Sequence, residues 1–170
     1  EASFSARTVD SIPQHMSYVL ERAMQHKGTS FVEIYQNCLI FNDKTFEPVV
    51  GREHRDDRMV LLYDEKPLIF GKDKDKAIRL NGLTPEQVNL KDVPKEELLI
   101  HHEKSASPHY AYLLTQMNYP QMPVPFGIFR AVERPTFDGL MEDQIQAAIK
   151  EKGLGDLKKL IHGENTWRVE

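Results

Sequence analysis

The interpretation of this chain begins with residues 29–43, TSFVEIYQNCLIFND, which follow a turn glycine at position 28. Four closely spaced apolar residues predict that this segment opens as a buried strand: Phe31, Val32, Ile34 and Tyr35. The apolar pattern stops at Gln36-Asn37, and Cys38, the only cysteine of the chain, comes directly after it. Because ligands and cofactors of open α/β sheets lie at the carboxyl ends of strands, this position suits a residue that does chemistry or holds a metal.

The residues before this strand predict another strand and a helix. Residues 2–9, ASFSARTV, alternate small or apolar residues with polar ones, which is typical of a short strand. An apolar stripe at helical spacing follows over residues 12–24. A helix that joins two short strands so closely predicts a βαβ unit with parallel strands and a covered sheet. His15 and His26 lie off the apolar stripe and are predicted to be solvated.

The remaining chain predicts a mixture of short strands, turns and helices. Two apolar runs predict strands at 60–63 and 68–70, and the second pairs with residues 77–80 in a β-hairpin. Residues 84–97 predict short turns, and three prolines within 119–125 argue against a helix or a central strand there. The later elements are expected to be a helix over 107–118, a strand over 126–132, and helices over 138–152 and 154–161.

Size and composition are those of an ordinary soluble domain. The chain has 170 residues, of which 40% are hydrophobic and 28% charged, and its net charge is −4. The acidic balance argues against a general nucleic-acid binder. No apolar run approaches the roughly 20 residues of a membrane span, so we expect no membrane association. A single cysteine excludes an internal disulfide, which suits an expected cytoplasmic location.

Three segments together carry a family resemblance. They are GTSFVEIYQNCLIFND at 28–43, GKDKDK at 71–76 and PVPFGIFRAVERP at 123–135. With these segments the chain resembles the C-terminal part of the β subunit of 2-oxoacid:ferredoxin oxidoreductases, and most of all the 2-oxoglutarate type. This β subunit is the one that binds thiamine diphosphate. Each segment alone is modestly specific, whereas three in the right order are specific and cover nearly the whole chain.

The resemblance implies an α/β fold, the C-terminal portion of a thiamine-diphosphate-binding fold. It implies a mostly parallel sheet, a β-hairpin insertion and a helical C-terminal extension. We therefore expect residues 1–63 to be the C-terminal βαβ part of the cofactor-binding domain and residues 64–170 to be an extension packed on it. Since the chain begins with Glu1 and a strand-like segment follows at once, we expect it to be a fragment of the subunit.

The resemblance also implies a role for Cys38. In the family, three cysteines from the N-terminal half and a fourth at this position bind a 4Fe–4S cluster beside the thiamine diphosphate. Such a cluster is held by four thiolates, so we expect this chain alone to lack it. From residue type alone, a lone cysteine is more often a small buried hydrophobe, and that alternative stays open.

The site of thiamine diphosphate and Mg²⁺ is expected mostly outside this chain. The family holds both with a Gly-Asp-Gly motif and a later Asn, and no Gly-Asp-Gly occurs here. Asn37, Asn42 and Asp43 are the candidates for lining the cofactor pocket. Asn and Asp also cap loops by hydrogen-bonding to the backbone, which is the alternative role of all three.

Cations surround the expected hairpin turn: Lys72, Lys74, Lys76 and Arg79. Such a group attracts anions, for example the phosphates of coenzyme A or an acidic face of ferredoxin. Asp73 and Asp75 alternate with the lysines and nearly cancel their charge. A solvated hairpin tip is therefore the favoured prediction.

Two other polar clusters have no assigned chemistry. The histidine-rich segment 101–109 invites interpretation as a metal site, but neighbouring residues on a strand point to opposite faces and rarely share one ion. Arg130 and Arg134, with Glu133, follow an apolar strand. They predict an ion-paired structural cluster.

The resemblance implies an enzyme subunit. The intact enzyme would convert a 2-oxoacid, expected to be 2-oxoglutarate, and coenzyme A to acyl-CoA and CO₂ with reduction of ferredoxin. It would act together with an α subunit. The chain alone is expected to be inactive. The alternative from another class is a non-catalytic interaction module that keeps the fold, suggested by the proline-rich segment 119–125 and the apolar tail around Trp167.

Overall fold

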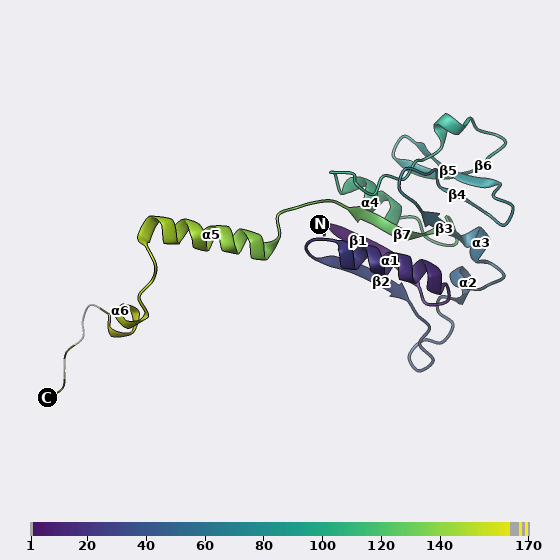
Figure 1. The fold of residues 1–170 in the computed structure, drawn as a ribbon. Helices are drawn as coiled ribbons and strands as arrows, with labels where there is room; N and C mark the ends of the chain where they lie inside the picture. The colour runs from purple at the N-terminus through teal and green to yellow at the C-terminus, as the bar shows by residue number, and fades with distance from the viewer. Residues whose placement is uncertain (1, 164–166, 168, 170) are drawn as a thin grey trace. The chain divides into compact units, whose positions relative to one another are not determined.

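The structure, a computed structural model, describes residues 2–163, 167 and 169 (Figure 1). The chain divides into two compact units, residues 1–134 and residues 135–170. The first unit carries the sheets, so it contains both the expected cofactor-binding part, 1–63, and much of the expected extension. The expected boundary at residue 63 remains a prediction about the intact protein.

The first unit contains both strands and helices. Its strands are β1 (Phe4–Val9), β2 (Ser30–Tyr35), β3 (Met59–Leu62), β4 (Ile69–Phe70), β5 (Lys76–Asn81), β6 (Thr84–Asn89) and β7 (Val124–Ala131). Its helices are α1 (Pro13–Gln25), α2 (Glu47–Val50), α3 (Arg55–Arg58), the 3₁₀ helix η1 (Lys95–Glu97) and α4 (His109–Thr115). The second unit holds α5 (Phe137–Lys152) and α6 (Leu157–His162). Within the described ranges, none of these helices has the length and apolar character needed to cross a membrane.

The first three elements form the predicted βαβ unit. β1 and β2 pair in parallel, and their last residues, Val9 and Tyr35, lie opposite each other. α1 begins at Pro13, whose missing N–H costs little in the first turn of a helix. The buried Val19 of α1 packs onto Phe4 and its neighbours. The prediction of a parallel, covered βαβ unit is confirmed.

Four strands make up the main sheet, in the order β2-β1-β7-β3. β1 is parallel to β2 and antiparallel to β7, and β3 is parallel to β7. Because two of these three pairings are parallel, the predicted α/β class with a mostly parallel sheet is confirmed. The carboxyl ends of β1 and β2 therefore lie at the same end of the sheet as the amino ends of β3 and β7.

β7 and β3 approach each other closely at Gly127. Its φ is +136°, a value that L side chains rarely adopt, and a Cβ added there would lie 2.7 Å from the carbonyl oxygen of Leu62. Because real Cβ atoms do not approach other atoms so closely, this position requires glycine. The glycine of the segment FGIF thus sets the spacing at the centre of the sheet.

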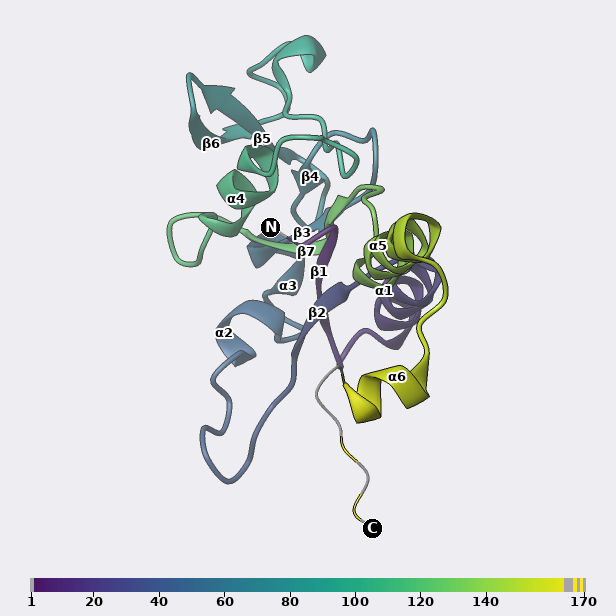
Figure 2. The same cartoon turned by 90° about the vertical axis from the view of Figure 1, so that its left-hand side faces the viewer.

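Helices cover both faces of the main sheet. On one face, α1 packs over β1 and β7 through Val19 and Ile128. On the other face, Leu114 of α4 packs in the cluster that contains Phe129. Figure 2 shows α1 and α4 on opposite sides of β1 and β7. The neighbours Ile128 and Phe129 thus fill opposite cores, and burial of each side chain contributes about 2 kcal/mol.

The strands β4, β5 and β6 form a separate antiparallel sheet in that order. The pairing of β4 with β5 confirms the predicted hairpin. β6 occupies residues 84–89, where turns were predicted, and that prediction is wrong. Pro85 is tolerated because β6 is an edge strand of this sheet. Pairing with β5, in which Asn81 lies opposite Thr84, outweighs the weak preference of these residues for turns.

β7 also begins earlier than its prolines predict. It starts at Val124, so Pro125 lies inside a strand of the main sheet. Pro125 lies opposite Val60 of β3, whereas pairing with β1 begins only at Gly127. The missing N–H is therefore tolerated near the start of the strand, where β7 pairs with one neighbour only.

Two histidines of α1 contradict the prediction that they are solvated. His15 is buried, and its Nδ1 lies 2.8 Å from the Thr8 hydroxyl oxygen. Burial lowers the pKa of His15. His26 is half-buried, with its Nε2 2.8 Å from the hydroxyl oxygen of Ser3. Hydroxyl groups in and beside β1 satisfy both rings, which the helical pattern alone does not reveal.

The second unit, taken by itself, consists of two capped helices. The Thr136 hydroxyl accepts a backbone hydrogen bond at the start of α5, and the Asp156 carboxylate accepts two at the start of α6. Large apolar side chains are exposed on both helices, and Trp167 is exposed as well. The rest of the tail that was predicted to pack, at 166 and 168, lies outside the described residues.

Candidate functional site

The Cys38 loop, defined as residues 36–46, connects β2 to α2 at the carboxyl end of the parallel strands β1 and β2. It projects from the sheet in both ribbon views (Figure 1 and Figure 2). Cys38 lies exposed in this loop as a free thiol. The alternative of a small buried hydrophobe therefore does not describe this cysteine.

A clasp made by Asn37, Asp43 and Lys44 closes the base of the Cys38 loop. The Asn37 Nδ2 donates to Asp43 Oδ1 at 2.9 Å, and the Asn37 Oδ1 accepts the backbone N–H of Lys44 at 2.8 Å. Lys44 has a φ of +60°, the left-handed conformation that turns the chain. Inside the clasp, the backbone N–H of Asn42 donates to the Cys38 carbonyl oxygen at 3.1 Å. The loop is thus held by its own hydrogen bonds.

The backbone of the Cys38 loop favours the thiolate form of Cys38. Hydrogen bonds from the backbone of Phe41 and Ile40, and a weaker one from Asn42, lower the pKa of the Cys38 thiol because they stabilise the thiolate. The thiolate is the form of cysteine that binds metals. Hydrogen bonds to ligand sulfurs also tune iron–sulfur clusters. The chemistry of this donor therefore fits a metal-bound thiolate.

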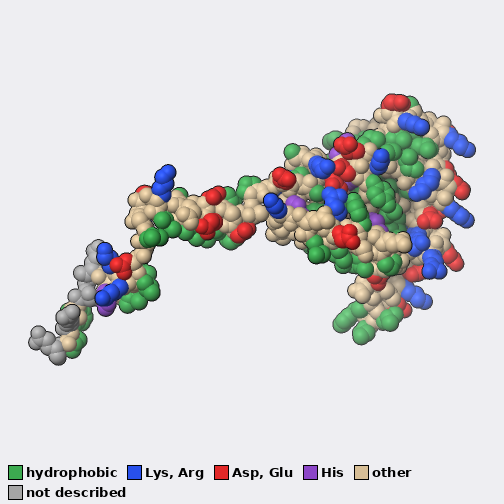
Figure 3. Space-filling view, viewed as in Figure 1, with side chains coloured by type: hydrophobic (Ala, Val, Ile, Leu, Met, Phe, Trp, Pro, Cys, Tyr) green, Lys and Arg blue, Asp and Glu red, His purple; other side chains and the backbone are tan. Residues whose placement is uncertain are grey.

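Apolar side chains of the same loop face the solvent. Leu39, Ile40 and Phe41 are 77%, 88% and 90% exposed. The space-filling view shows hydrophobic side chains covering this projecting loop (Figure 3). Phe31 and Ile34 of β2 are exposed too, although this strand was predicted to be buried. That prediction is wrong for this chain, because within the described residues β2 pairs with β1 alone.

A cavity of about 250 Å³ lies beside the base of the Cys38 loop, at the same end of the sheet. It is lined by the stacked rings of Tyr35 and Phe46, whose centroids are 4.1 Å apart, and by Asn37. The clasp occupies the Asn37 amide, which is the loop-capping role considered as the alternative. The role of Asn37, Asn42 and Asp43 toward thiamine diphosphate remains a prediction.

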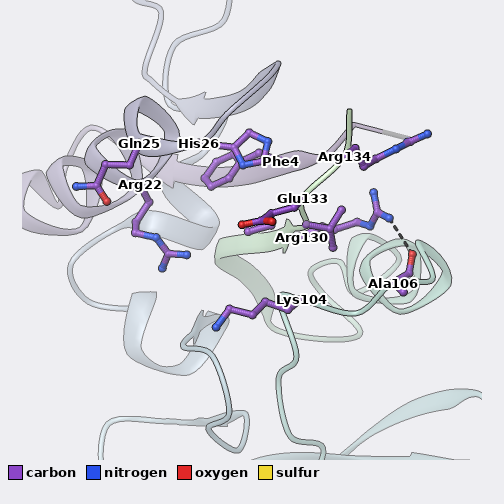
Figure 4. Close-up of a pocket in the computed structure, with 11 residues that line it drawn as sticks. Phe4, Arg22, Gln25, His26, Lys104, Ala106, Arg130, Glu133 and Arg134 are labelled. Carbon is purple, nitrogen blue, oxygen red and sulfur yellow. Dashed lines mark hydrogen bonds between the residues drawn. The ribbon is translucent and has the colours of Figure 1, made fainter. Parts of the chain in front are cut away.

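A larger cavity, of about 690 Å³, lies at the opposite end of the sheet, where β1 begins and β7 ends (Figure 4). Its cations are Arg22, Lys104, Arg130 and Arg134. Arg22 donates to Glu103 at 2.5 Å, and the Glu103 side chain is only 2% exposed. Lys104 pairs with Asp64 at 3.2 Å. Protein carboxylates therefore already neutralise two of these cations, which disfavours an anion site.

Arg130 is buried at this end of the sheet. Its guanidinium donates to the carbonyl oxygens of Ala2 and Ala106, each at 2.8 Å, and Figure 4 shows the second bond. Its Nε has no hydrogen-bond partner among the described residues. Arg130 thus ties β7 to two other segments through backbone carbonyls, whereas an ion pair was predicted.

The histidine-rich segment is built into the core. His101 is buried, with its Nε2 2.7 Å from the Ile128 carbonyl oxygen and its Nδ1 3.2 Å from the Tyr110 hydroxyl. Burial lowers the pKa of His101, and the bond to Ile128 partly opposes that shift. Burial also raises the pKa of Tyr110. Among the residues that the structure describes, no group of three or more His, Cys, Asp or Glu side chains is arranged to hold a metal ion.

Two of the four hairpin cations, Lys76 and Arg79, are paired with carboxylates. Lys76 Nζ lies 2.7 Å from Asp57, and the salt bridge lowers the pKa of that carboxyl. Arg79 contacts Glu86 at 3.3 Å and Glu97 at 3.2 Å. This pairing agrees with the favoured prediction of a solvated hairpin tip.

The comparisons with known proteins concern the whole chain. No family model matches it. The chain is 32% identical, over 173 aligned residues, to the 2-oxoglutarate oxidoreductase subunit KorB of Mycobacterium tuberculosis. The chain is similar to KorB along its whole length. The alignment covers 100% of this chain and 46% of KorB, so the chain spans about half the length of the curated relative that it matches. The resemblance noted from the sequence is confirmed.

Sequence reasoning placed Cys38 correctly after a strand, in a chain that resembles KorB throughout, but it missed two features. The buried pair of Arg22 and Glu103 joins residues 81 positions apart, so no local sequence pattern predicts it. The N–H groups around the Cys38 sulfur depend on the backbone path of the loop. The spacing of Asn37 and Asp43, which flank a short apolar run, is a signal that could have pointed to a closed loop.

Proposed function

We propose that this chain is part of the β subunit of a 2-oxoacid:ferredoxin oxidoreductase that acts on 2-oxoglutarate. Its likeness to KorB over the whole chain supports the family. The observation that carries the proposal is the exposed free thiol of Cys38 at the carboxyl end of the parallel strands β1 and β2. Because the chain spans about half of KorB, the activity belongs to the larger protein.

The complete enzyme converts a 2-oxoacid and coenzyme A to acyl-CoA and CO₂. This conversion also releases one proton and two electrons, and the electrons pass to ferredoxin. Bound thiamine diphosphate with Mg²⁺ supplies the decarboxylation chemistry, and a 4Fe–4S cluster supplies the route for electrons. The residues of this chain contribute binding and orientation.

Cys38 is the residue of this chain that would hold the cluster, as one of its four thiolate ligands. An exposed sulfur is accessible to a shared metal centre, and its N–H contacts stabilise the charged form that binds iron. The other three thiolates must come from outside this chain, which has a single cysteine. We therefore expect this chain alone to be inactive and free of the cluster.

Asn37, Asn42 and Asp43 are proposed to border the thiamine diphosphate pocket. Asn37 lines the cavity at the base of the Cys38 loop and is held there by Asp43. Their contribution is to shape the wall of the pocket, since the Gly-Asp-Gly that binds diphosphate and Mg²⁺ in the family is absent from this sequence.

The proposed partners are an α subunit, ferredoxin and coenzyme A, in the cytoplasm. Residues 1–63 would complete the cofactor-binding domain, and residues 64–170 would form the extension. The exposed apolar side chains of α5 and α6 suit contact with the α subunit.

The test is an assay of the complete complex, purified without oxygen after co-expression of the full-length subunit with its α subunit. We expect reduction of ferredoxin that requires both 2-oxoglutarate and coenzyme A, and a much slower reaction with pyruvate. The matched control is the present chain alone, which is expected to give no turnover. A complex that reduces ferredoxin with neither 2-oxoacid would contradict the proposal.

A further inference from the structure

Three large apolar side chains form the tip of the Cys38 loop: Leu39, Ile40 and Phe41. They belong to none of the three buried hydrophobic clusters of the first unit. An exposed apolar group of this kind, set among polar residues, marks a protein interaction site. Figure 3 shows the hydrophobic side chains at the projecting end of the loop.

The tip is presented in a fixed shape. The clasp of Asn37, Asp43 and Lys44 closes the loop below the tip, and the bond from Asn42 N–H to the Cys38 carbonyl oxygen closes it again one residue further in. A preformed surface binds a partner at a lower entropic cost than a flexible one. The exposure of the tip is therefore a property of the folded loop.

The tip and the sulfur are parts of one structure. Leu39, Ile40 and Phe41 follow Cys38 directly in the chain, and the side chains of all four residues are exposed. Any metal centre bound at this sulfur is consequently bordered by the apolar tip. The polypeptide that supplies the other ligands of that centre must therefore lie close to Cys38.

We propose that Leu39, Ile40 and Phe41 are the surface that packs against the polypeptide carrying the other three cluster thiolates, and that this contact keeps water from the cluster. The inference rests on the proposed function. The alignment leaves more than half of KorB unmatched, which is ample length for such a polypeptide. A second copy of this chain fits less well, because each copy supplies only one cysteine toward the four thiolates.

Burial of the tip has a measurable consequence for the cluster. The apolar shell around a metal site controls solvent access. Replacing one tip side chain by serine is therefore expected to open the cluster to water, chelators and oxygen. It leaves the Cys38 side chain itself unchanged, so this ligand is preserved.

The experiment uses the complete complex, purified without oxygen, with the variants Phe41→Ser and Ile40→Ser. The matched control is Leu83→Ser, since Leu83 is 87% exposed at the turn between β5 and β6. The measurement is the rate at which an iron chelator bleaches the visible absorbance of the cluster. We expect bleaching about tenfold faster for Phe41→Ser than for the wild type. Leu83→Ser is expected to match the wild type.

Further variants and outcomes separate this inference from the proposed function. Phe41→Leu, which keeps an apolar side chain, is expected to bleach as slowly as the wild type. Serine variants that fail to assemble with the remaining polypeptide, while Phe41→Leu assembles, would also support the interface. Equal bleaching of Phe41→Ser, Ile40→Ser and Leu83→Ser would overturn the inference. A wild-type complex without iron would instead overturn the proposed function.

Discussion

The two ends of the main sheet differ in what they leave exposed. At the end where β7 finishes, the charged groups of Arg22, Glu103 and Arg130 find partners within the chain. At the end where β2 finishes, the loop satisfies its own polar groups and exposes Ile40 and Phe41. The first end pairs most of its charged groups within the chain, although the Nε of Arg130 has no hydrogen-bond partner among the described residues, whereas the second end exposes apolar side chains.

The comparison distinguishes charged groups that stabilise the fold from exposed groups that are available to a partner. The larger cavity is lined by several cations. Carboxylates already pair with Arg22 and Lys104, and a backbone carbonyl accepts from Arg130. The Cys38 loop has a smaller cavity but presents an unpaired thiol and apolar side chains together. Whether a cavity suits an anion is thus better judged from the partners of its charged groups than from the number of those groups.

The largest expected effect tests the closed end through the variant Arg22→Met. It would leave the buried Glu103 carboxylate without its cation, which is expected to cost about 3 kcal/mol of unfolding free energy. Urea unfolding of this chain measures the loss. The control is Lys104→Met in the same cavity, whose solvent-exposed salt bridge with Asp64 is expected to contribute much less to stability. Equal losses for the two variants would contradict the distinction between a buried and a solvated pair.

The next effect tests the packing between the two ends through Gly127→Ala. The added Cβ would clash with Leu62 and would hold a positive φ, so a loss of about 2 kcal/mol or more is expected in urea unfolding. Gly82→Ala is the matched control, since Gly82 also has a positive φ, of +62°, but nothing lies within 4 Å of its added Cβ. Its loss is expected to be about 1 kcal/mol. If Gly82→Ala costs as much as Gly127→Ala, the close approach of β3 and β7 is wrong.

A smaller effect concerns pH and the buried histidines. Burial lowers the pKa of both His15 and His101 in the folded chain below the ordinary 6.5, so the unfolded chain binds more protons. The stability that depends on neutral rings is therefore present above pH 6.5 and is lost as the pH falls below that value. Unfolding free energies measured across this range should decrease toward acid. His101→Gln should weaken the dependence on pH.

The smallest effect concerns the thiol at the open end. Backbone N–H groups lower the pKa of Cys38, so its alkylation rate should reach half its plateau at a lower pH in the folded chain than in urea. Because Cys38 is the only cysteine, the reaction reports on it alone. Asn37→Ala, which removes the clasp, should move the midpoint toward the urea value. Coinciding midpoints for the folded and unfolded wild type would show that the N–H groups do not hold the sulfur.

Local patterns predicted much of the fold. The β-branched run at 31–35 and the apolar stripe at 12–24 were sufficient for the βαβ unit, because both signals lie within one element. They failed at β6 and at Pro125, where pairing with a distant strand decides the conformation. The central position of β7 between β1 and β3 is likewise a long-range fact that spacing along the chain does not encode.

The candidate site was predictable to a similar degree. The position of Cys38 after a strand follows from the order of residues, and its exposure agrees with a ligand role. The solvated interpretation of His15 failed because its partner, Thr8, lies on a neighbouring strand. The apolar pattern of β2 predicted burial, yet Phe31 is exposed. An apolar pattern indicates which side chains favour burial, but it does not identify what covers them.

The most direct test of the central claim is the iron and acid-labile sulfide content of the complete complex carrying Cys38→Ser, measured beside the wild type after anaerobic purification. We expect the wild-type complex to hold a 4Fe–4S cluster, and the assembled variant to lose most of its iron, sulfide and cluster absorbance. An assembled Cys38→Ser complex with the iron and sulfide content of the wild type would contradict the assignment of this thiolate as a cluster ligand.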